Sequence, residues 1–248
     1  MHSLARLLTL LLILAVPLRA QTALANAQRA QAMLGPAVWS QIIRVDNEAR
    51  ASRYPQTVHA LVFELAEILW FYTDADGTQS FSLHRGQLAE EKADFGPLLR
   101  GIDPGFRRWT PITRPPQEPG DGKAPLRNGC FIESFALLRE RLSRGASIRE
   151  PRLLSYYADT ASGSKGHTVL AFEIAGSIEV FDPIRPGRRS VFPQALGADP
   201  LALARAIEGR SVTKARVIPL ELPAIAPAIM ADVRGSRTDA RAAAQGES

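Results

Sequence analysis

One segment without regular structure divides this sequence into two parts. Residues 114–129 read RPPQEPGDGKAPLRNG. Proline lacks a backbone donor and glycine favours turns, so this stretch is too rich in both for a helix or a strand. We predict that it crosses the surface as a loop. It separates residues 26–113, expected to form antiparallel strands and a helix, from residues 130–223, expected to form a second region that starts at Cys130.

The composition is that of a globular protein with an ordinary charge balance. Of the 248 residues, 46% are hydrophobic and 22% are charged, which is enough to bury a core. The net charge is +5. The positive charges are scattered among acids, with no basic run interleaved with aromatic residues, so no nucleic-acid partner is expected. One cysteine and a few separated histidines lack the ligand spacing of zinc sites, and no metal or other cofactor is predicted.

Both ends of the chain are expected to lie outside the fold. Residues 1–25 combine a short basic start, an apolar run and an Ala23-Leu24-Ala25 cleavage site, the pattern of a signal peptide. The apolar run is shorter than the roughly 20 residues that span a bilayer. We therefore expect a periplasmic or secreted protein with no stable membrane span after leader removal; an uncleaved anchor is the alternative. Residues 224–248 lack apolar periodicity and are predicted to be disordered.

The region before the loop has the pattern of an antiparallel meander. Residues 38–47, 57–73 and 77–86 are rich in β-branched and aromatic residues, with stretches of alternation that favour strands. Asp76-Gly77 can take the positive backbone angles of a tight hairpin turn. Residues 87–102 follow as an amphipathic helix, acidic at its start and ending near a glycine.

The region after the loop mixes helices and strands, which makes the chain α+β. The sequence predicts, in order, a helix from Cys130, a hairpin at 167–183, a short strand at 188–193, a helix at 199–209 and a strand at 214–222.

Cys130 opens the predicted helix that follows the loop. Phe131, Phe135, Leu138 and Leu142 form one apolar stripe of that helix, which should pack into a core. Asn128 is the N-cap candidate, so Cys130 falls in the first turn, where free N–H groups and the helix dipole favour a thiolate. The alternative is a buried cysteine that acts as a small hydrophobe. An exported chain gives an idle thiol no protection from oxidation, which favours a chemical role.

His167 and Asp182 are the candidate base and acid. A turn centred on Ala175-Gly176 gives paired positions that sum to 351, so Asp182 faces Val169 and His167 is its diagonal neighbour. Such diagonals lie about 7–8 Å apart by Cα, within reach of a carboxylate and an imidazole. A three-residue loop would send Asp182 to the opposite face. Alternatively, the histidine is structural and Asp182-Pro183 only ends a strand.

The order of these residues resembles that of a known enzyme class. A cysteine at a helix start, a histidine that opens a strand and an Asp-Pro that ends the next strand are similar to papain-like and transglutaminase-like thiol enzymes. The resemblance covers residues 128–193. Within that class, the spacing 182 − 167 = 15 is closer to bacterial transglutaminase-like cysteine peptidases and to peptidases of the bacteriocin-processing type than to papain.

This resemblance implies a fold, a reaction and a substrate class. The fold would be a papain-like or transglutaminase-like core, with the helix of the cysteine packed on an antiparallel sheet. Cys130 would attack a carbonyl of a peptide or protein substrate, His167 would transfer the proton and Asp182 would orient the imidazole. Water as the second substrate gives a cysteine peptidase, and an amine gives transglutaminase-type transfer.

The sequence also departs from papain in the residues around the nucleophile. Phe131 follows the cysteine, and no glutamine lies a few residues upstream to complete an oxyanion hole. The backbone N–H of Cys130 is one candidate donor, and Asn128, Gln117 and Trp109 are candidates for the other.

Three arginines close to the predicted acid are candidate substrate ligands. Arg185, Arg188 and Arg189 could hold a carboxylate or phosphate of the substrate, although such clusters are more often solvated turns. A non-catalytic binding or assembly protein on the same fold is an alternative for the whole chain. An intermolecular disulfide through Cys130 is a third.

Overall fold

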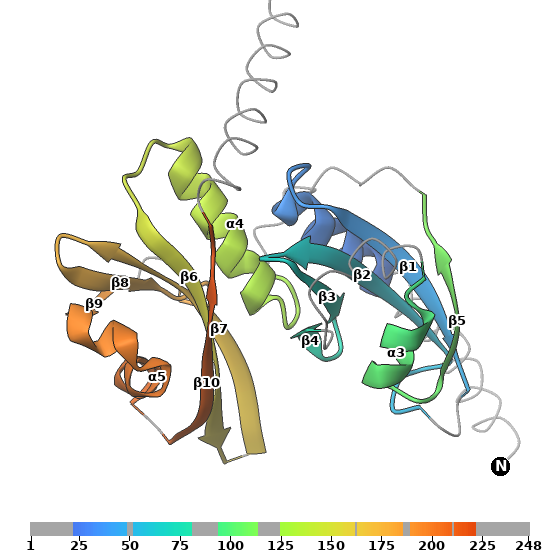
Figure 1. The fold of residues 1–248 in the computed structure, drawn as a ribbon. Coiled ribbons are helices and arrows are strands. Elements are labelled where there is room, and N and C mark those ends of the chain that lie inside the picture. The colour runs from blue at the N-terminus through green and yellow to red at the C-terminus, as the bar shows by residue number, and fades with distance from the viewer. Residues whose placement is uncertain are drawn as a thin grey trace, which may run out of the picture. The chain divides into compact units, whose positions relative to one another are not determined.

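The computed structural model describes residues 22–48, 52–80, 94–113, 125–161, 163–185, 189–209 and 211–221. These residues form two compact units. Unit 1 contains Val38–Gly129 and the described residues before Leu34, and unit 2 contains Leu34–Ala37 and the described residues from Cys130 onward. In the described residues each unit has one five-stranded antiparallel sheet together with helices (Figure 1), so the α+β class is confirmed. The predicted leader, residues 1–25, lies almost wholly outside the described residues, and the predicted tail lies entirely outside them.

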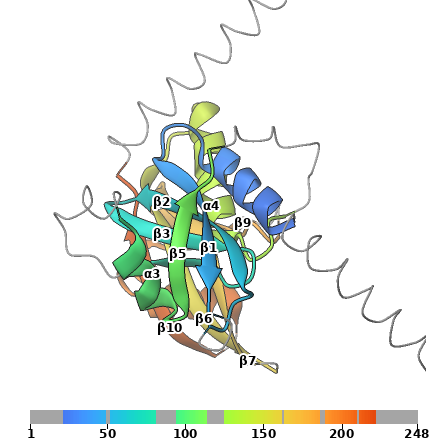
Figure 2. The ribbon, with the colours of Figure 1, turned by 90° about the vertical axis from the view of Figure 1, so that its right-hand side faces the viewer.

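The sheet of unit 1 is a meander extended by one strand. Its order is β4-β3-β2-β1-β5, so the first four strands pair with their neighbours in sequence and β5 joins the free edge of β1. A helix over residues 22–34 precedes the sheet, and α3 lies beside β5 (Figure 2). The elements are β1 Ser40–Asn47, β2 Thr57–Leu65, β3 Ile68–Thr73, β4 Gly77–Ser80, α3 Gly96–Ile102 and β5 Phe106–Pro111.

Three features of unit 1 differ from the sequence prediction. Residues 57–73 form two strands rather than one, because Ala66 and Glu67 take left-handed φ angles of 54° and 57° and turn the chain. Neither alanine nor glutamate is a residue type that favours such a turn. In the described part of 87–102, the helix begins only at Gly96; residues 81–93 lie outside the described residues. The short strand β5 was not predicted, and four of its six residues are exposed.

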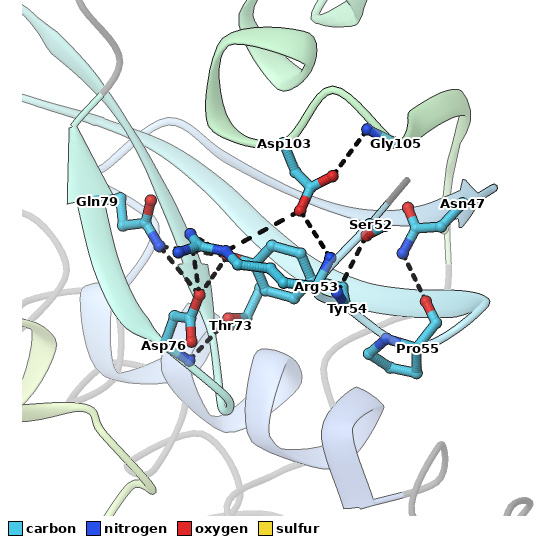
Figure 3. Close-up of polar contacts among 10 residues, drawn as sticks. All are labelled: Asn47, Ser52, Arg53, Tyr54, Pro55, Thr73, Asp76, Gln79, Asp103 and Gly105. Atoms are coloured by element: carbon cyan, nitrogen blue, oxygen red, sulfur yellow. Dashed lines mark hydrogen bonds and ion pairs between the residues drawn. The ribbon is translucent and has the colours of Figure 1, made fainter. Parts of the chain in front are cut away.

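A polar network joins three loops of unit 1 (Figure 3). The hydroxyl of Tyr54 donates to Asp76 Oδ2 at 2.5 Å, and the Arg53 guanidinium lies 3.1 Å from the same oxygen. Burial, the hydrogen bond to Asp76 and the charge of that carboxylate raise the pKa of Tyr54 to about 12, so the hydroxyl remains a donor. Asp103, only 2% exposed, accepts from the backbone N–H groups of Arg53 at 3.2 Å and Gly105 at 2.7 Å. The network therefore fixes irregular backbone around the sheet.

Loss of the buried carboxylate in this network should destabilise unit 1. Asp103→Ala leaves two backbone donors without their acceptor and is expected to lower the free energy of unfolding by about 3 kcal/mol. Asp46→Ala is the control: its side chain is 40% exposed and pairs with Arg44 at the surface, so the cost should stay below about 0.5 kcal/mol. Urea unfolding followed by tryptophan fluorescence measures both, because all three tryptophans of the chain lie in unit 1. Equal losses would contradict this account of Asp103.

The sheet of unit 2 has the order β10-β6-β7-β8-β9. Helix α4 packs on β6 and β7, and α5 packs on β6 and β10 (Figure 1). The elements are α4 Cys130–Ser143, β6 Arg149–Thr160, β7 Gly163–Ile174, β8 Ser177–Phe181, β9 Arg189–Pro193, the 3-10 helix η1 Gln194–Ala198, α5 Pro200–Glu208 and β10 Val212–Pro219.

Both helices of unit 2 bury the apolar residues that the sequence indicates. Of the predicted stripe on α4, Phe131, Phe135 and Leu138 are buried, whereas Leu142 is only partly buried. Helix α5 contributes Leu203 and Ala204 to a cluster with β6, β7 and β8. The sheet residues of this cluster include Leu154, Tyr156, Val169, Ala171, Ile178 and Val180. Strand β6, which both α4 and α5 contact, was not predicted.

Candidate functional site

Cys130 is the first residue of α4, as predicted, and its side chain is partly exposed. Residues just before it are held within unit 1. The Tyr72 hydroxyl donates to the Arg127 carbonyl at 2.8 Å, and the Asn128 amide donates to the carbonyls of Asp74 at 2.9 Å and Ala75 at 2.8 Å. Helix α4 begins at Cys130, so Asn128 lies one residue further from the helix than the predicted N-cap position.

The β7–β8 hairpin has the predicted register. Leu170 pairs with Phe181 and Ile174 with Ser177, so the paired positions sum to 351. The two-residue turn has φ angles of 48° at Ala175 and 77° at Gly176, the left-handed values that a tight hairpin of this hand requires. Strand β8 ends at Phe181, opposite Leu170, so the first part of β7 extends beyond the end of its partner strand.

His167 and Asp182 meet at this end of the hairpin. His167 Nε2 lies 3.0 Å from Asp182 Oδ1, which is the diagonal contact that the register predicts. Each side chain is 13% exposed. The same carboxylate oxygen accepts from the Ile184 backbone N–H at 2.9 Å, and Oδ2 lies 3.8 Å from Arg185 Nε. The turn after β8 therefore holds the carboxylate in place.

Opposite effects act on the two titratable groups of this pair. Burial raises the pKa of Asp182, but the hydrogen bond and charge of His167, the Ile184 N–H and the charge of Arg185 lower it below the ordinary value. Burial lowers the pKa of His167, but hydrogen bonding to Asp182 and Cys130 and the charges of both groups outweigh it and raise the pKa to about 9. Asp182 and Cys130 thus both raise the pKa of His167, and the imidazole is protonated at neutral pH.

Ser134 ties the helix of the cysteine to the strand of the histidine. It lies one helical turn after Cys130, it is fully buried, and its Oγ donates to the Thr168 carbonyl at 3.1 Å. Thr168 directly follows His167. This hydrogen bond fixes α4 against β7 close to both reactive groups. The sequence prediction missed Ser134, although a serine among the apolar residues of a buried helix face is itself a signal.

The remaining predicted site residues differ in how the structure places them. Trp109 belongs to unit 1, where its indole N–H donates to Asp94 at 3.3 Å, and both amide contacts of Asn128 are made to backbone carbonyls of the same unit. These contacts occupy the donors that an oxyanion would need. Gln117 and Arg188 lie outside the described residues. Arg189 pairs with the buried Glu179.

Arg185 is the arginine that the structure brings to the candidate site. Its side chain is 47% exposed beside Asp182, so its charge is available to solvent on one side and contacts the acid on the other. Its role as a ligand for a substrate carboxylate or phosphate stays a prediction.

Comparison with protein-family models, with curated proteins and with solved structures gave no match. Within the described ranges, no cluster of three or more His, Cys, Asp or Glu side chains is arranged to hold a metal ion. The helices in that part of the chain are all too short or too polar to cross a membrane. Any function proposed for this chain therefore rests on the geometry of its own residues.

Removal of the Ser134 hydroxyl should loosen the contact between α4 and β7. Ser134→Ala leaves the Thr168 carbonyl buried without this donor and is expected to lower the free energy of unfolding by about 1–2 kcal/mol. Ser143→Ala is the matched control, because that hydroxyl donates to the Glu140 carbonyl within α4 itself. Urea unfolding followed by far-ultraviolet circular dichroism measures both variants. A Ser143→Ala loss as large as that of Ser134→Ala would argue against a tether.

The stabilisation by His167 should depend on pH in a defined direction. Because folding raises the pKa of His167 from 6.5 to about 9, its contribution is complete below pH 6.5 and disappears as the pH rises through 9. Asp182, whose pKa is lowered, contributes above pH 3.8 and loses its contribution as the pH falls further. The free energy of unfolding of wild type, measured by urea unfolding, should exceed that of His167→Gln by on the order of 2 kcal/mol at pH 5. At pH 9.5 the two free energies should differ little. An equal difference at both pH values would contradict the charged pair.

Proposed function

We propose that this chain is an exported thiol enzyme that transfers acyl groups, most simply a cysteine peptidase. The observation that supports it best is that His167 Nε2 lies 3.0 Å from the Asp182 carboxylate, on the strand against which the helix that begins at Cys130 packs. Cys130 also contributes to the raised pKa of His167. A nucleophile, a base and a group that orients the base are the minimum set for this chemistry. The three side chains come from α4, β7 and the turn after β8, all within unit 2.

Each residue has one chemical task in this proposal. Nε2 of His167 carries a proton toward Asp182, so Nδ1 is the nitrogen that serves Cys130. The Cys130 sulfur, as thiolate beside the protonated imidazole, attacks the carbonyl carbon of an amide or ester. A C–S bond forms and the C–N or C–O bond then breaks, while His167 gives its proton to the leaving group. Asp182 keeps the imidazole in orientation and remains ionised.

The second half of the reaction regenerates the thiolate. A water molecule attacks the thioester, neutral His167 accepts its proton, and the carboxylic acid leaves as the C–S bond breaks. An amine in place of water would yield a new amide and make the enzyme a transglutaminase-type transferase. Developing negative charge on the carbonyl oxygen is stabilised by the backbone N–H of Cys130 at the start of α4.

The fold of unit 2 fits this class of enzyme. A helix that begins with the nucleophile packs on an antiparallel sheet that carries the base and the acid, as in the papain-like or transglutaminase-like core that the sequence resembles. We propose a peptide or protein substrate, with Arg185 beside the site as the ligand for a substrate anion. The leader predicted from the sequence supports a location in the periplasm or outside the cell.

Alkylation of Cys130 tests the proposal directly, because the chain has one cysteine. At pH 6, iodoacetamide should label the folded protein at least tenfold faster than it labels the urea-denatured chain or His167→Ala. The difference should narrow by pH 9, where an ordinary thiol with a pKa of about 8.5 is ionised without help. Mass spectrometry measures the rates. Labelling of the folded protein no faster than that of His167→Ala would sink the proposal.

A second measurement separates hydrolysis from transfer. A peptide mixture incubated with the protein is analysed with and without a small primary amine. Products that gain water at a cleaved amide indicate a peptidase, and products that gain the amine indicate a transferase. Cys130→Ser should abolish both, whereas a non-catalytic binding protein would give neither product with wild type or variant.

A further inference from the structure

The aromatic ring of Tyr156 packs against the imidazole of His167. The two residues are directly opposite each other on β6 and β7. Their ring centroids are 5.6 Å apart and the ring planes are at 88°. Tyr156 is 1% exposed, so this edge-to-face contact is made in the packed interior of unit 2.

The tyrosine is itself held from a different element. Its hydroxyl donates to Glu208 Oε2 at 3.2 Å, and Glu208 is the last residue of α5. The helix is fixed at both ends: the Asp199 carboxylate accepts from the N–H groups of Leu201 and Ala202, and Gly209 ends the helix with a φ of 64°. Burial and the nearby carboxylate of Glu208 raise the pKa of Tyr156, so the phenol keeps its proton and remains the donor in this contact.

The hydrogen bond that His167 donates to Asp182 does not fix the imidazole by itself. A single Nε2···Oδ1 contact sets the position of one nitrogen, but the ring can still tilt about that contact. A perpendicular aromatic ring packed against the imidazole limits the tilt, and the pair also gains from the attraction between the edge of one ring and the face of the other. In the proposed mechanism, this keeps Nδ1 available to serve Cys130.

We infer that Tyr156, anchored by Glu208, is a positioning residue that holds His167 in the orientation needed for acyl transfer. This inference rests on the proposed function. It gives α5 a role in the site although the helix contributes no reactive group. Two supports on different elements, Asp182 after β8 and Tyr156 on β6, then define one orientation of the base.

Variants at Tyr156 test this role with a matched control. Tyr156→Leu removes the aromatic ring, and Tyr156→Phe keeps the ring but loses the contact with Glu208. Leu154→Ala is the control, because Leu154 lies two residues away in the same buried cluster and pairs with Val169. This substitution removes core packing but leaves the aromatic ring that faces His167. All measurements are made at a temperature at which circular dichroism shows each variant to be folded.

Iodoacetamide labelling of Cys130 at pH 6 gives the first readout. We expect Tyr156→Leu to slow it roughly tenfold, Tyr156→Phe two- to threefold and Leu154→Ala by less than twofold. The second readout is the ¹⁵N signal of the His167 imidazole, assigned by its loss in His167→Gln. Asp182 and Cys130 raise the His167 pKa, so a ring that tilts away from them in Tyr156→Leu should titrate with a midpoint moved from about 9 toward 6.5, whereas the midpoint should stay near 9 in Leu154→Ala.

The two readouts separate the inference from the proposed function. If wild-type Cys130 reacts no faster than in His167→Ala, acyl transfer is excluded, and with it any catalytic meaning of Tyr156. If wild type reacts rapidly but Tyr156→Leu keeps both its rate and the His167 midpoint, Tyr156 is not a positioning residue although the proposed function stands. Slower labelling together with a lowered midpoint in Tyr156→Leu, but not in Leu154→Ala, supports the inference.

Discussion

The hydrogen bond between His167 and Asp182 is the contact on which the candidate site depends. It exists because β7 and β8 pair in one register and because β8 ends one residue before the aspartate. A slip of one residue would turn the carboxylate to the other face of the sheet. The Ala175-Gly176 turn therefore sets the position of Asp182 relative to His167 from the opposite end of the hairpin.

Partial burial of His167 and Asp182 has a desolvation cost, and it also strengthens the interaction between their charges. Removal from water disfavours the charged forms of the imidazole and the carboxylate, yet each group is stabilised in its charged form by the other and by its neighbours. The Ile184 N–H and Arg185 support the acid, while Cys130 interacts with the base. The result is an imidazole that is charged at neutral pH, whereas an exposed histidine with an ordinary pKa is mostly neutral there.

How far the sequence predicts the structure varies with the range of the interactions involved. The β7–β8 hairpin, the start of α4 at Cys130 and helix α5 follow from turn residues, apolar periodicity and caps close in sequence. Strand β6 was missed because Pro151 and charged residues obscure its start, where the register shifts between Arg149 and Arg152. The turn at Ala66-Glu67 was missed because its left-handed backbone is imposed by the pairing of β2 with β3.

The sequence by itself predicted that His167 and Asp182 are neighbours, on the condition that the turn centred on Ala175-Gly176 has the right length, because a hairpin turn fixes the relation of residues a short distance apart. It also placed the cysteine at a helix start. Only the tertiary structure decided that this helix meets β7 near His167, through the buried bond of Ser134, and that Tyr156 faces the imidazole. Those contacts join segments far apart in the chain, and they form only when apolar faces on α4, α5 and the sheet are buried together.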